Sequence, residues 1–224
     1  GAYVDLGVNI FYTDSLYDRS ATVFHMAQGM VNTAGMATDR QFAFPIRNQM
    51  FEIRGKKASG VDLPAVNVQR AREMGVQGYN EVRTKIPGLA RVASFDALSN
   101  EIDAANIQLL KNTYTSVDDI DLYVGLLMEK KSDTIASLGP TGGTIIAEQF
   151  SSFKKGDRFF YESTDSAGAL TQAEYDAIKG FTFSQLICEN TDGMIMVPED
   201  IFQHNARKVR CADFKPFTMA SILY

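Results

Sequence analysis

The sequence has 224 residues, of which 45 % are apolar and 22 % are charged, a composition typical of a globular protein rather than a disordered or fibrous one. Its net charge of −5 and its lack of a basic cluster argue against a nucleic-acid-binding surface. No apolar run in the sequence is long enough to span a membrane, and there is no secretory signal. Because the first residue is Gly1 rather than Met, the missing signal says nothing about the compartment.

The first expected helix lies within 39–53, and a loop rich in glycine and lysine follows at 54–60. Pro45 is expected to begin or kink this helix, because proline fits the first turn of a helix but not its interior. The apolar positions of the amphipathic segment are Phe44, Ile46, Met50 and Phe51.

The clearest helix start is in DLPAVNVQRAREMGVQGY (62–79), where Asp62 is expected to cap the helix and Pro64 lies in its first turn. Spacings of three, four and seven place four side chains on one face: Leu63, Val66, Asn67 and Arg70. A buried amide without a partner is costly. Asn67 and Arg70 are therefore either solvated or bonded to nearby carbonyls, or they face a polar ligand across an apolar wall. An arginine in that place suits a carboxylate or a phosphate.

The rest of the chain also favours short helices, so the expected fold class is mainly α with few short strands. A capping box at 116–119 and a GPTGG turn at 139–143 each precede an apolar helical stripe. Three aspartates at 118, 119 and 121 lie at a helix start, which favours capping and stabilisation of the helix dipole over cation binding. The remaining expected elements are helices at 97–114, 120–129, 145–153, 171–180 and 184–190, with strands at 158–163 and 194–198.

Cys188 and Cys211 are the only cysteines of the chain. Composition alone leaves open whether they are free and buried or form one disulfide that closes a loop. Metal binding by the pair is disfavoured, because no nearby Cys or His supplies further ligands. His25 and His204 are isolated in the sequence, and we expect each to be structural or solvated.

Five segments resemble, in the same order, the animal haem peroxidase family (the group of myeloperoxidase, peroxidasin and peroxinectin). They are DLPAVNVQR with GYNEVR, SVDDIDLYVGLLMEK, GPTGGTIIAEQF, KKGDRFFYES and SQLICENTDG, and RNQMFE (47–52) also fits the family. The resemblance covers essentially the whole chain but only the C-terminal part of the family's catalytic domain. It therefore implies the C-terminal part of that helical peroxidase domain.

The resemblance implies roles for particular residues. Asn67 matches the asparagine that bonds the second nitrogen of the proximal haem-ligand histidine, and Arg70 matches an arginine that pairs with a haem propionate. Four apolar residues match the packing on the proximal side: Leu63, Val66, Met50 and Phe51. For Met50, a plain core role is the preferred interpretation. The family often has Arg-Asp-His-Gly at 72–75, where this chain reads Arg-Glu-Met-Gly.

In the family, the distal histidine, the catalytic arginine, the proximal histidine and a calcium loop belong to the N-terminal part. His25 and His204 match none of these ligands, so no catalytic residue is expected in this chain. Residues 1–224 are expected to form a single C-terminal fragment that is not a complete domain alone. Its expected partner is an N-terminal peroxidase fragment or chain. The two would share haem b or a modified haem, and any calcium would lie in the N-terminal part.

Together with that part, the expected activity is reduction of hydrogen peroxide and oxidation of a halide, phenolic or tyrosyl donor. The alternative is a haem-free, peroxidase-like adhesion or extracellular-matrix protein, and retention of both Asn67 and Arg70 argues against it. Cys188 and Cys211 match the family's C-terminal pair, which implies a disulfide and a secreted, extracellular or secretory-granule location. Lys155-Gly156-Asp157 resembles an adhesion tripeptide, but a structural turn is the favoured interpretation.

Overall fold

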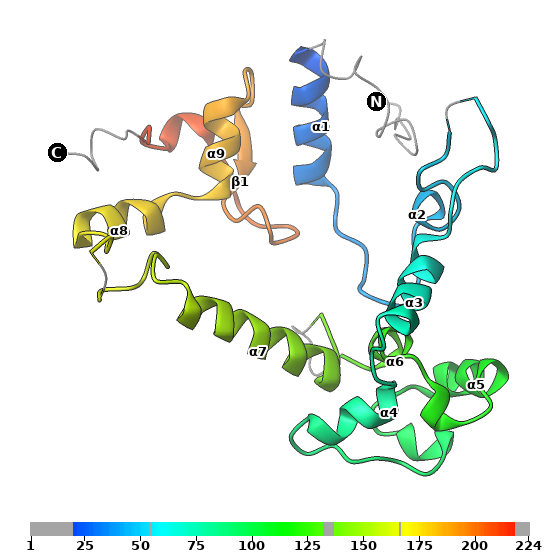
Figure 1. The fold of residues 1–224 in the computed structure, drawn as a ribbon. Coiled ribbons are helices and arrows are strands. Elements are labelled where there is room, and N and C mark those ends of the chain that lie inside the picture. Colours follow the sequence, from blue (N-terminus) through cyan, green and yellow to red (C-terminus); the bar gives the residue numbers. More distant parts are fainter. Residues whose placement is uncertain (1–19, 54, 132–136, 166, 218–224) are drawn as a thin grey trace. The chain divides into compact units, whose positions relative to one another are not determined.

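The computed structural model describes residues 20–53, 55–131, 137–165 and 167–217, with side chains described from residue 25 onward (Figure 1). The described residues fall into two compact units. The first unit contains 37–153, and the second combines 20–36 with 154–217. Short helices dominate both units, which confirms the predicted fold class.

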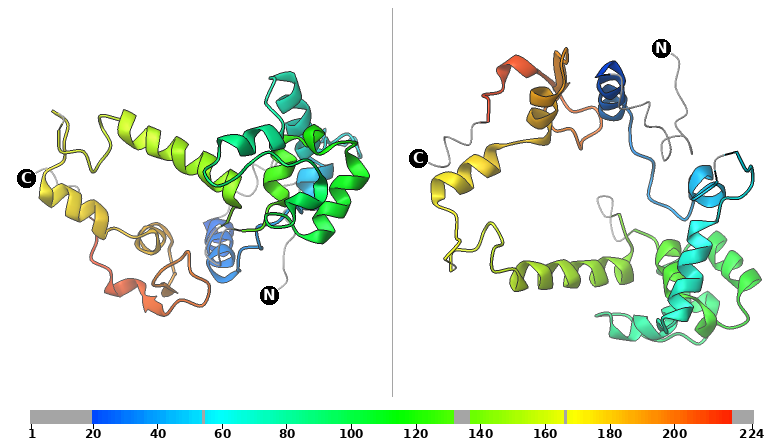
Figure 2. Two further views of the ribbon diagram at one scale, coloured as in Figure 1. Left: turned by 90° about the horizontal axis from the view of Figure 1, so that it is seen from below. Right: turned by 45° about the horizontal axis from the view of Figure 1, so that its top comes forward.

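The first unit contains most of the helices, and Figures 1 and 2 show α3, α4, α5 and α6 gathered side by side. Its elements are α2 (Phe44–Asn48), α3 (Leu63–Glu73), α4 (Tyr79–Val82), the 3₁₀ helices η3 (Arg83–Lys85) and η4 (Phe95–Leu98), α5 (Ala104–Thr113), the 3₁₀ helix η5 (Val117–Asp119), α6 (Leu122–Met128) and most of α7 (Pro140–Gly156).

The second unit combines helices with a two-stranded antiparallel sheet, in which Val197 pairs with Val209. Its elements are α1 (Ser20–Asn32), α8 (Gln172–Gly180), α9 (Phe183–Asn190), β1 (Met196–Pro198), β2 (Lys208–Arg210) and the 3₁₀ helix η6 (Cys211–Asp213). In the part of the chain that the structure describes, no helix has the combination of length and apolarity needed to cross a membrane.

Two helix starts that the sequence predicts are confirmed. The Asp62 carboxylate accepts the backbone N–H of Ala65 at 3.0 Å, with proline in the first turn of α3. Thr171 and Glu174 form a complete capping box at the start of α8. Both signals are local in sequence, and this is why they can be recognised without knowledge of the tertiary structure.

Three predicted helix starts differ from the structure. The helix expected from residue 97 begins only at Ala104, after the 3₁₀ helix η4. The capping box of Ser116 and Asp119 begins η5 rather than α6. The expected GPTGG turn is instead the first turn of α7, which starts at Pro140, because proline is well suited to the first helical position.

One of the two predicted strands is wrong. Segment 158–163 forms turns, because the backbone N–H groups of Phe160 and Ser163 bond to carbonyls three residues earlier. The other prediction is confirmed in its last three residues, which form β1. Its partner β2 was not predicted from the sequence.

The core of the first unit forms around Tyr79 of α4, which is completely buried. A Cβ atom at Gly125 of α6 would lie 2.7 Å from the Tyr79 Cβ and closer still to the ring, so these two helices pack without space for another side chain. The remaining buried members are Leu98, Ile102, Ile107, Leu110, Val117 and Ile120.

A buried polar network passes through the same core. The Tyr79 hydroxyl donates to Glu129 Oε1 at 2.7 Å, and the backbone N–H of Thr141 donates to Glu129 Oε2 at 3.0 Å. Arg83 lies 3.3 Å from Glu101 with its side chain buried. Burial, together with the Glu129 carboxylate, raises the pKa of Tyr79. The network joins α4 to the residues after α6 and to the start of α7.

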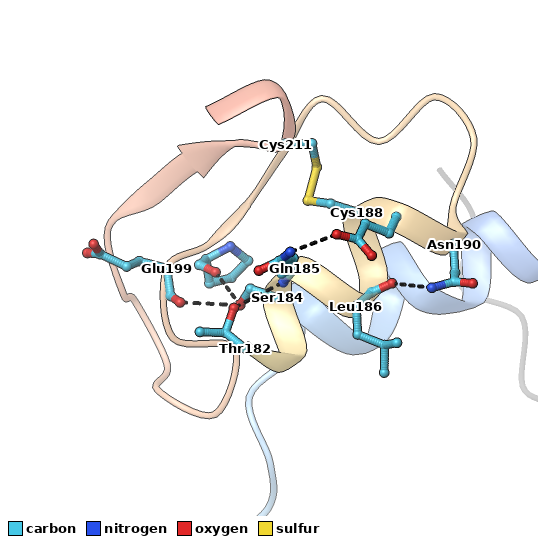
Figure 3. Close-up of a disulfide and its surroundings, with 10 residues drawn as sticks. Thr182, Ser184, Gln185, Leu186, Cys188, Asn190, Glu199 and Cys211 are labelled. Carbon is cyan, nitrogen blue, oxygen red and sulfur yellow. Dashed lines mark hydrogen bonds between the residues drawn. A yellow bond between two sulfur atoms is a disulfide. The ribbon is translucent and has the colours of Figure 1, made fainter. Parts of the chain in front are cut away.

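The second unit contains the predicted disulfide between Cys188 and Cys211, which are 23 positions apart in sequence (Figure 3). The bond joins α9 to the residues directly after β2. Near it, the Ser184 hydroxyl donates to the carbonyl of Pro198 at 2.7 Å, so α9 is also fixed to the end of β1. The disulfide prediction is therefore confirmed.

Candidate functional site: the open face of helix α3

The structure places the four predicted haem-wall residues of α3 on one side of the helix, which we call the open face of α3. Asn67 and Arg70 are exposed, Val66 is 39 % exposed, and Leu63 is half-buried. No residue of α3, all of which the structure describes, reaches full burial. A helix that covers so little of its apolar stripe has a free surface for a further group.

The opposite side of α3 faces helix α6. Ala65 and Val68 of α3 line a groove of about 250 Å³ together with Val124 and Leu127 of α6. Arg72 extends from the same side of α3 toward the start of α6 and meets Asp121 there. These contacts hold α3 on the side that faces α6, and the open face lies on the opposite side of the helix.

A cluster of three polar side chains binds α3 on the side that faces α6. The Arg72 guanidinium donates from Nε to Asp121 Oδ1 at 2.8 Å and from Nη2 to Asp121 Oδ2 at 2.6 Å, while the Tyr114 hydroxyl donates to Oδ2 at 2.8 Å. Arg72, and then Tyr114, hold the pKa of Asp121 below its usual value. Burial and the Asp121 carboxylate raise the pKa of Tyr114 to about 12. We call these three residues the Arg72 clamp.

The polar groups of the open face have few partners. The Asn67 carboxamide makes no hydrogen bond to any residue that the structure describes. Arg70 lies 3.6 Å from Glu73, with both side chains about two-thirds exposed (67 % and 65 %). Exposed pairs of this kind contribute little to stability. The amide and the guanidinium are thus available to a ligand.

The side chains of the open face are of the types that could hold the edge of a haem group and an imidazole. Leu63 and Val66 supply apolar surface, Arg70 supplies a cation for a propionate, and the Asn67 side-chain oxygen can accept an imidazole N–H. All four sit on a regular helix, which positions side chains more rigidly than a loop does.

Met50 and Phe51, also predicted to pack on the proximal side, lie in the turn after α2. Met50 is half-buried, and its carbonyl accepts the backbone N–H of Val61 at 2.9 Å, just before α3 begins. Phe51 is 68 % exposed and has a positive φ of 59°, which is unusual for a residue other than glycine. Their packing against haem stays a prediction.

The two histidines lie away from α3 in sequence. His25 is exposed in α1, and His204 is exposed in the connection between β1 and β2. Within the described ranges, no cluster of three or more His, Cys, Asp or Glu side chains is arranged to hold a metal ion. At the end of α7, the carboxylate of Asp157 accepts the backbone N–H of Phe159 at 2.9 Å, as in a structural turn.

The aspartates at the start of α6 have partners that the sequence did not predict. Asp119 takes part in the capping box, as expected. Asp118 instead pairs with Asn80 and Arg91, and Asp121 pairs with Arg72. The capping interpretation is therefore wrong for the side chain of Asp121, because its carboxylate makes no cap bond to α6.

The sequence profile of the animal haem peroxidase family matches residues 2–202. Heme peroxidase 2 from Caenorhabditis elegans is 44 % identical over 210 residues, which are 92 % of this chain and 29 % of that protein. Lactoperoxidase from Mesocricetus auratus is 32 % identical over 172 residues, which are 75 % of this chain and 23 % of that protein. The solved structure of peroxidase A from Dictyostelium discoideum superposes with a TM-score of 0.63 at 30 % identity and covers 80 % of this chain and 32 % of its own.

The chain belongs to the animal haem peroxidase family, and the predicted resemblance is confirmed. Membership implies haem as the cofactor of the family domain. The chain spans less than a third of the length of these relatives. It therefore corresponds to only part of a peroxidase.

Proposed function

We propose that this chain forms part of the proximal haem wall of a peroxidase that reduces hydrogen peroxide and oxidises a halide, phenolic or tyrosyl donor. The observation that carries the proposal is the open face of α3. It presents an uncommitted carboxamide and a weakly paired guanidinium on an apolar stripe, in a member of a haem-binding family.

Asn67 is proposed to orient the axial ligand. Its side-chain oxygen would accept the N–H of a proximal histidine imidazole and so fix the ring orientation and the tautomer. Partners of this kind raise the basicity of a ligating histidine and tune the reduction potential of the metal. Because Asn67 has no competing partner among the described residues, forming this bond breaks none inside the chain.

Arg70 is proposed to bind a haem propionate. A guanidinium can hold a carboxylate through two parallel N–H donors, which fixes both position and orientation. The competing partner, Glu73, lies at 3.6 Å in an exposed pair, so exchanging it for a propionate costs little. Leu63 and Val66, with Met50 and Phe51 as further candidates, would exclude water from the same side.

Haem, when bound, supplies the electron transfer between peroxide and the donor substrate. The residues of this chain bind and orient that group but do not transfer protons to peroxide. We assign the acid–base step to a distal histidine and a catalytic arginine, which, with the proximal histidine, we place in an N-terminal peroxidase part that partners this chain.

We also propose an oxidising location, secreted, extracellular or in a secretory granule. The Cys188–Cys211 disulfide supports this, because such bonds persist mainly outside the reducing cytosol.

The role of Asn67 is tested by Asn67→Ala and Asn67→Asp in the complete haem protein. We expect both variants to shift the Fe(III)/Fe(II) reduction potential, since the bond to the axial imidazole is lost or changed in charge. Activity is expected to fall by about 10- to 100-fold. Asn112→Ala, which removes another exposed asparagine from a helix of the same unit, serves as the control. An unchanged potential and turnover in both Asn67 variants would refute the assignment.

A further inference from the structure

Helix α3 faces α6 across a partly exposed apolar groove and also has polar contacts to the first unit at its two ends. Just before its start, the bridge between Met50 and Val61 ties the chain to the turn after α2, while the Asp62 cap stabilises the helix itself. At its last turn, Arg72 bonds to Asp121. None of its side chains, all described, is buried in the core, so apolar packing alone constrains its rotation only weakly.

The Asp121 carboxylate, which binds Arg72, is fixed to the core of the first unit. The Asp121 side chain is only 9 % exposed. The carbonyl of the preceding residue, Ile120, accepts the N–H of Tyr79 at 2.8 Å, and the carbonyl of Asp121 accepts the N–H of Gly125 at 3.0 Å. Tyr114, at the end of α5, adds a third donor to the same carboxylate. Asp121 is therefore held by α4, α5 and α6 at once.

The two N–H bonds from Arg72 to Asp121 restrict how α3 can turn about its axis. Arg72 lies five residues after Asn67, which places the two side chains on different sides of the same helix. A rotation of about 20° would move an atom about 5 Å from the helix axis by about 2 Å. That displacement exceeds the tolerance of a hydrogen bond, whose length varies by about 0.5 Å. Whatever fixes the rotation of α3 thus also fixes the direction of the Asn67 Cα–Cβ bond, and so the region that the carboxamide can reach.

We propose that the Arg72 clamp is a positioning device for the haem site: Asp121, supported by Tyr114, sets the rotation of α3 and thereby the bond from Asn67 to the axial imidazole. This inference rests on the proposed function of Asn67. Tyr114 and Asp121 lie 42 and 49 positions after Arg72 in sequence. They would thus help to set the reduction potential of the haem iron without contacting the haem.

The experiment compares Asp121→Asn, Tyr114→Phe and Asn67→Ala in the complete haem protein. The readouts are the Fe(III)/Fe(II) reduction potential, the iron–imidazole stretching frequency from resonance Raman spectra, and the rate of haem loss. We expect Asp121→Asn to shift the potential and the frequency in the same direction as Asn67→Ala, with haem lost about tenfold faster. Tyr114→Phe should produce a smaller shift, because the ion pair remains.

Asp96→Asn is the matched control, since it removes a carboxylate that pairs with Lys111 in the same unit but does not contact α3. It should leave all three readouts unchanged. If Asn67→Ala shifts the potential while Asp121→Asn and Tyr114→Phe do not, the clamp is only structural and the inference is wrong, although the role of Asn67 stands. If none of the three shifts it, both proposals fail. Should Asp121→Asn yield no haem protein, Tyr114→Phe alone decides.

Discussion

Two asparagines of the first unit show how differently the same side chain is used. The Asn80 amide is fully buried and fully bonded, with Val92 at 2.9 Å and Asp118 at 2.6 Å as acceptors and the N–H of Val92 as a donor at 3.0 Å. Both of its N–H groups are used inside the core, so it can donate to a new partner only by breaking a buried bond. The Asn67 amide is exposed and makes none of these contacts. Only Asn67 is therefore suited to a partner outside this chain.

Arg70→Gln should weaken haem retention. The variant loses the cation proposed to hold a propionate but keeps an unbranched polar side chain with a similar helix propensity. We expect haem to dissociate from the complete protein about tenfold faster or more, as measured by transfer to an apo-globin acceptor, because a charged hydrogen bond contributes about 1.5–3 kcal/mol.

The chain offers a closely matched control for that measurement. Arg210 has the same kind of exposed partner three residues on, Asp213, and its side chain is 66 % exposed against 67 % for Arg70. Arg210→Gln should leave the rate of haem loss unchanged. Equal rates in wild type and both variants would show that Arg70 has no propionate-binding role.

Helix periodicity is enough to predict from the sequence that Asn67 and Arg70 share a face of the helix, and the structure confirms this prediction. The partners of Arg72 and Asp121 could not be predicted, because they lie 49 residues apart and each also has a plausible local role. An aspartate before a helix is most simply explained as a cap. Only the tertiary structure shows that this one bonds to another helix.

Among the elements, the contact of α4 with α6 depends on a glycine. Gly125→Ala should destabilise the complete protein by about 1–3 kcal/mol, because the added methyl group meets the buried Tyr79 side chain and the core is close-packed. The predicted result is a lower midpoint of thermal unfolding, measured by calorimetry.

Gly143→Ala is the control, and it should change the stability in the opposite direction. Gly143 lies in α7, and a methyl group there would have no atom within 4 Å apart from its own helix. Replacing a helical glycine by alanine in open space is expected to stabilise by about 0.5–1 kcal/mol. A Gly125→Ala variant as stable as wild type would contradict the close packing described for α4 and α6.

The disulfide is the main covalent constraint seen in the second unit. Cys188→Ser with Cys211→Ser should lower the stability of this unit by about 3 kcal/mol, since the bond closes a loop between residues 23 positions apart. Hydrogen exchange would show the loss as faster exchange in α9 and β2, with α4 and α6 unaffected. Equal exchange of α9 in both proteins would contradict this role.

The sequence indicates elements best where their signals are local. The caps at Asp62 and Thr171 and the ends of α8 follow from neighbouring residues. Strand β2 has three residues with a single apolar one, Val209, and exists because β1 and the disulfide lie beside it. Segment 158–163 has a strand-like composition but no partner strand in the described structure, so its backbone groups bond within turns instead.

The chain exposes many large apolar side chains in its first unit. Monomeric proteins seldom leave so many uncovered without a partner. We therefore maintain the proposal that the chain is a C-terminal fragment of a peroxidase domain that needs its N-terminal part to bury these groups. The exposed residues are Phe44, Phe51, Ile53, Val61, Val66, Met74, Val76, Leu109, Ile146, Phe150 and Phe153.

The family and the helical class could be predicted from the sequence, because ordered motifs extend along most of the chain. The haem contacts could not be derived from the residues alone, since the histidine to which Asn67 is proposed to bond would be supplied by another part of the protein. The structure shows that Asn67 and Arg70 lie on an exposed face of α3 and that the Arg72 clamp binds the opposite side of this helix.

The most direct test of this account is the absorbance spectrum of the complete protein purified natively without added haem. We predict stoichiometric haem with a strong Soret band that changes when hydrogen peroxide is added and returns when a phenolic donor follows. Protein that is folded but carries no stoichiometric haem would contradict the account and leave the haem-free, peroxidase-like alternative.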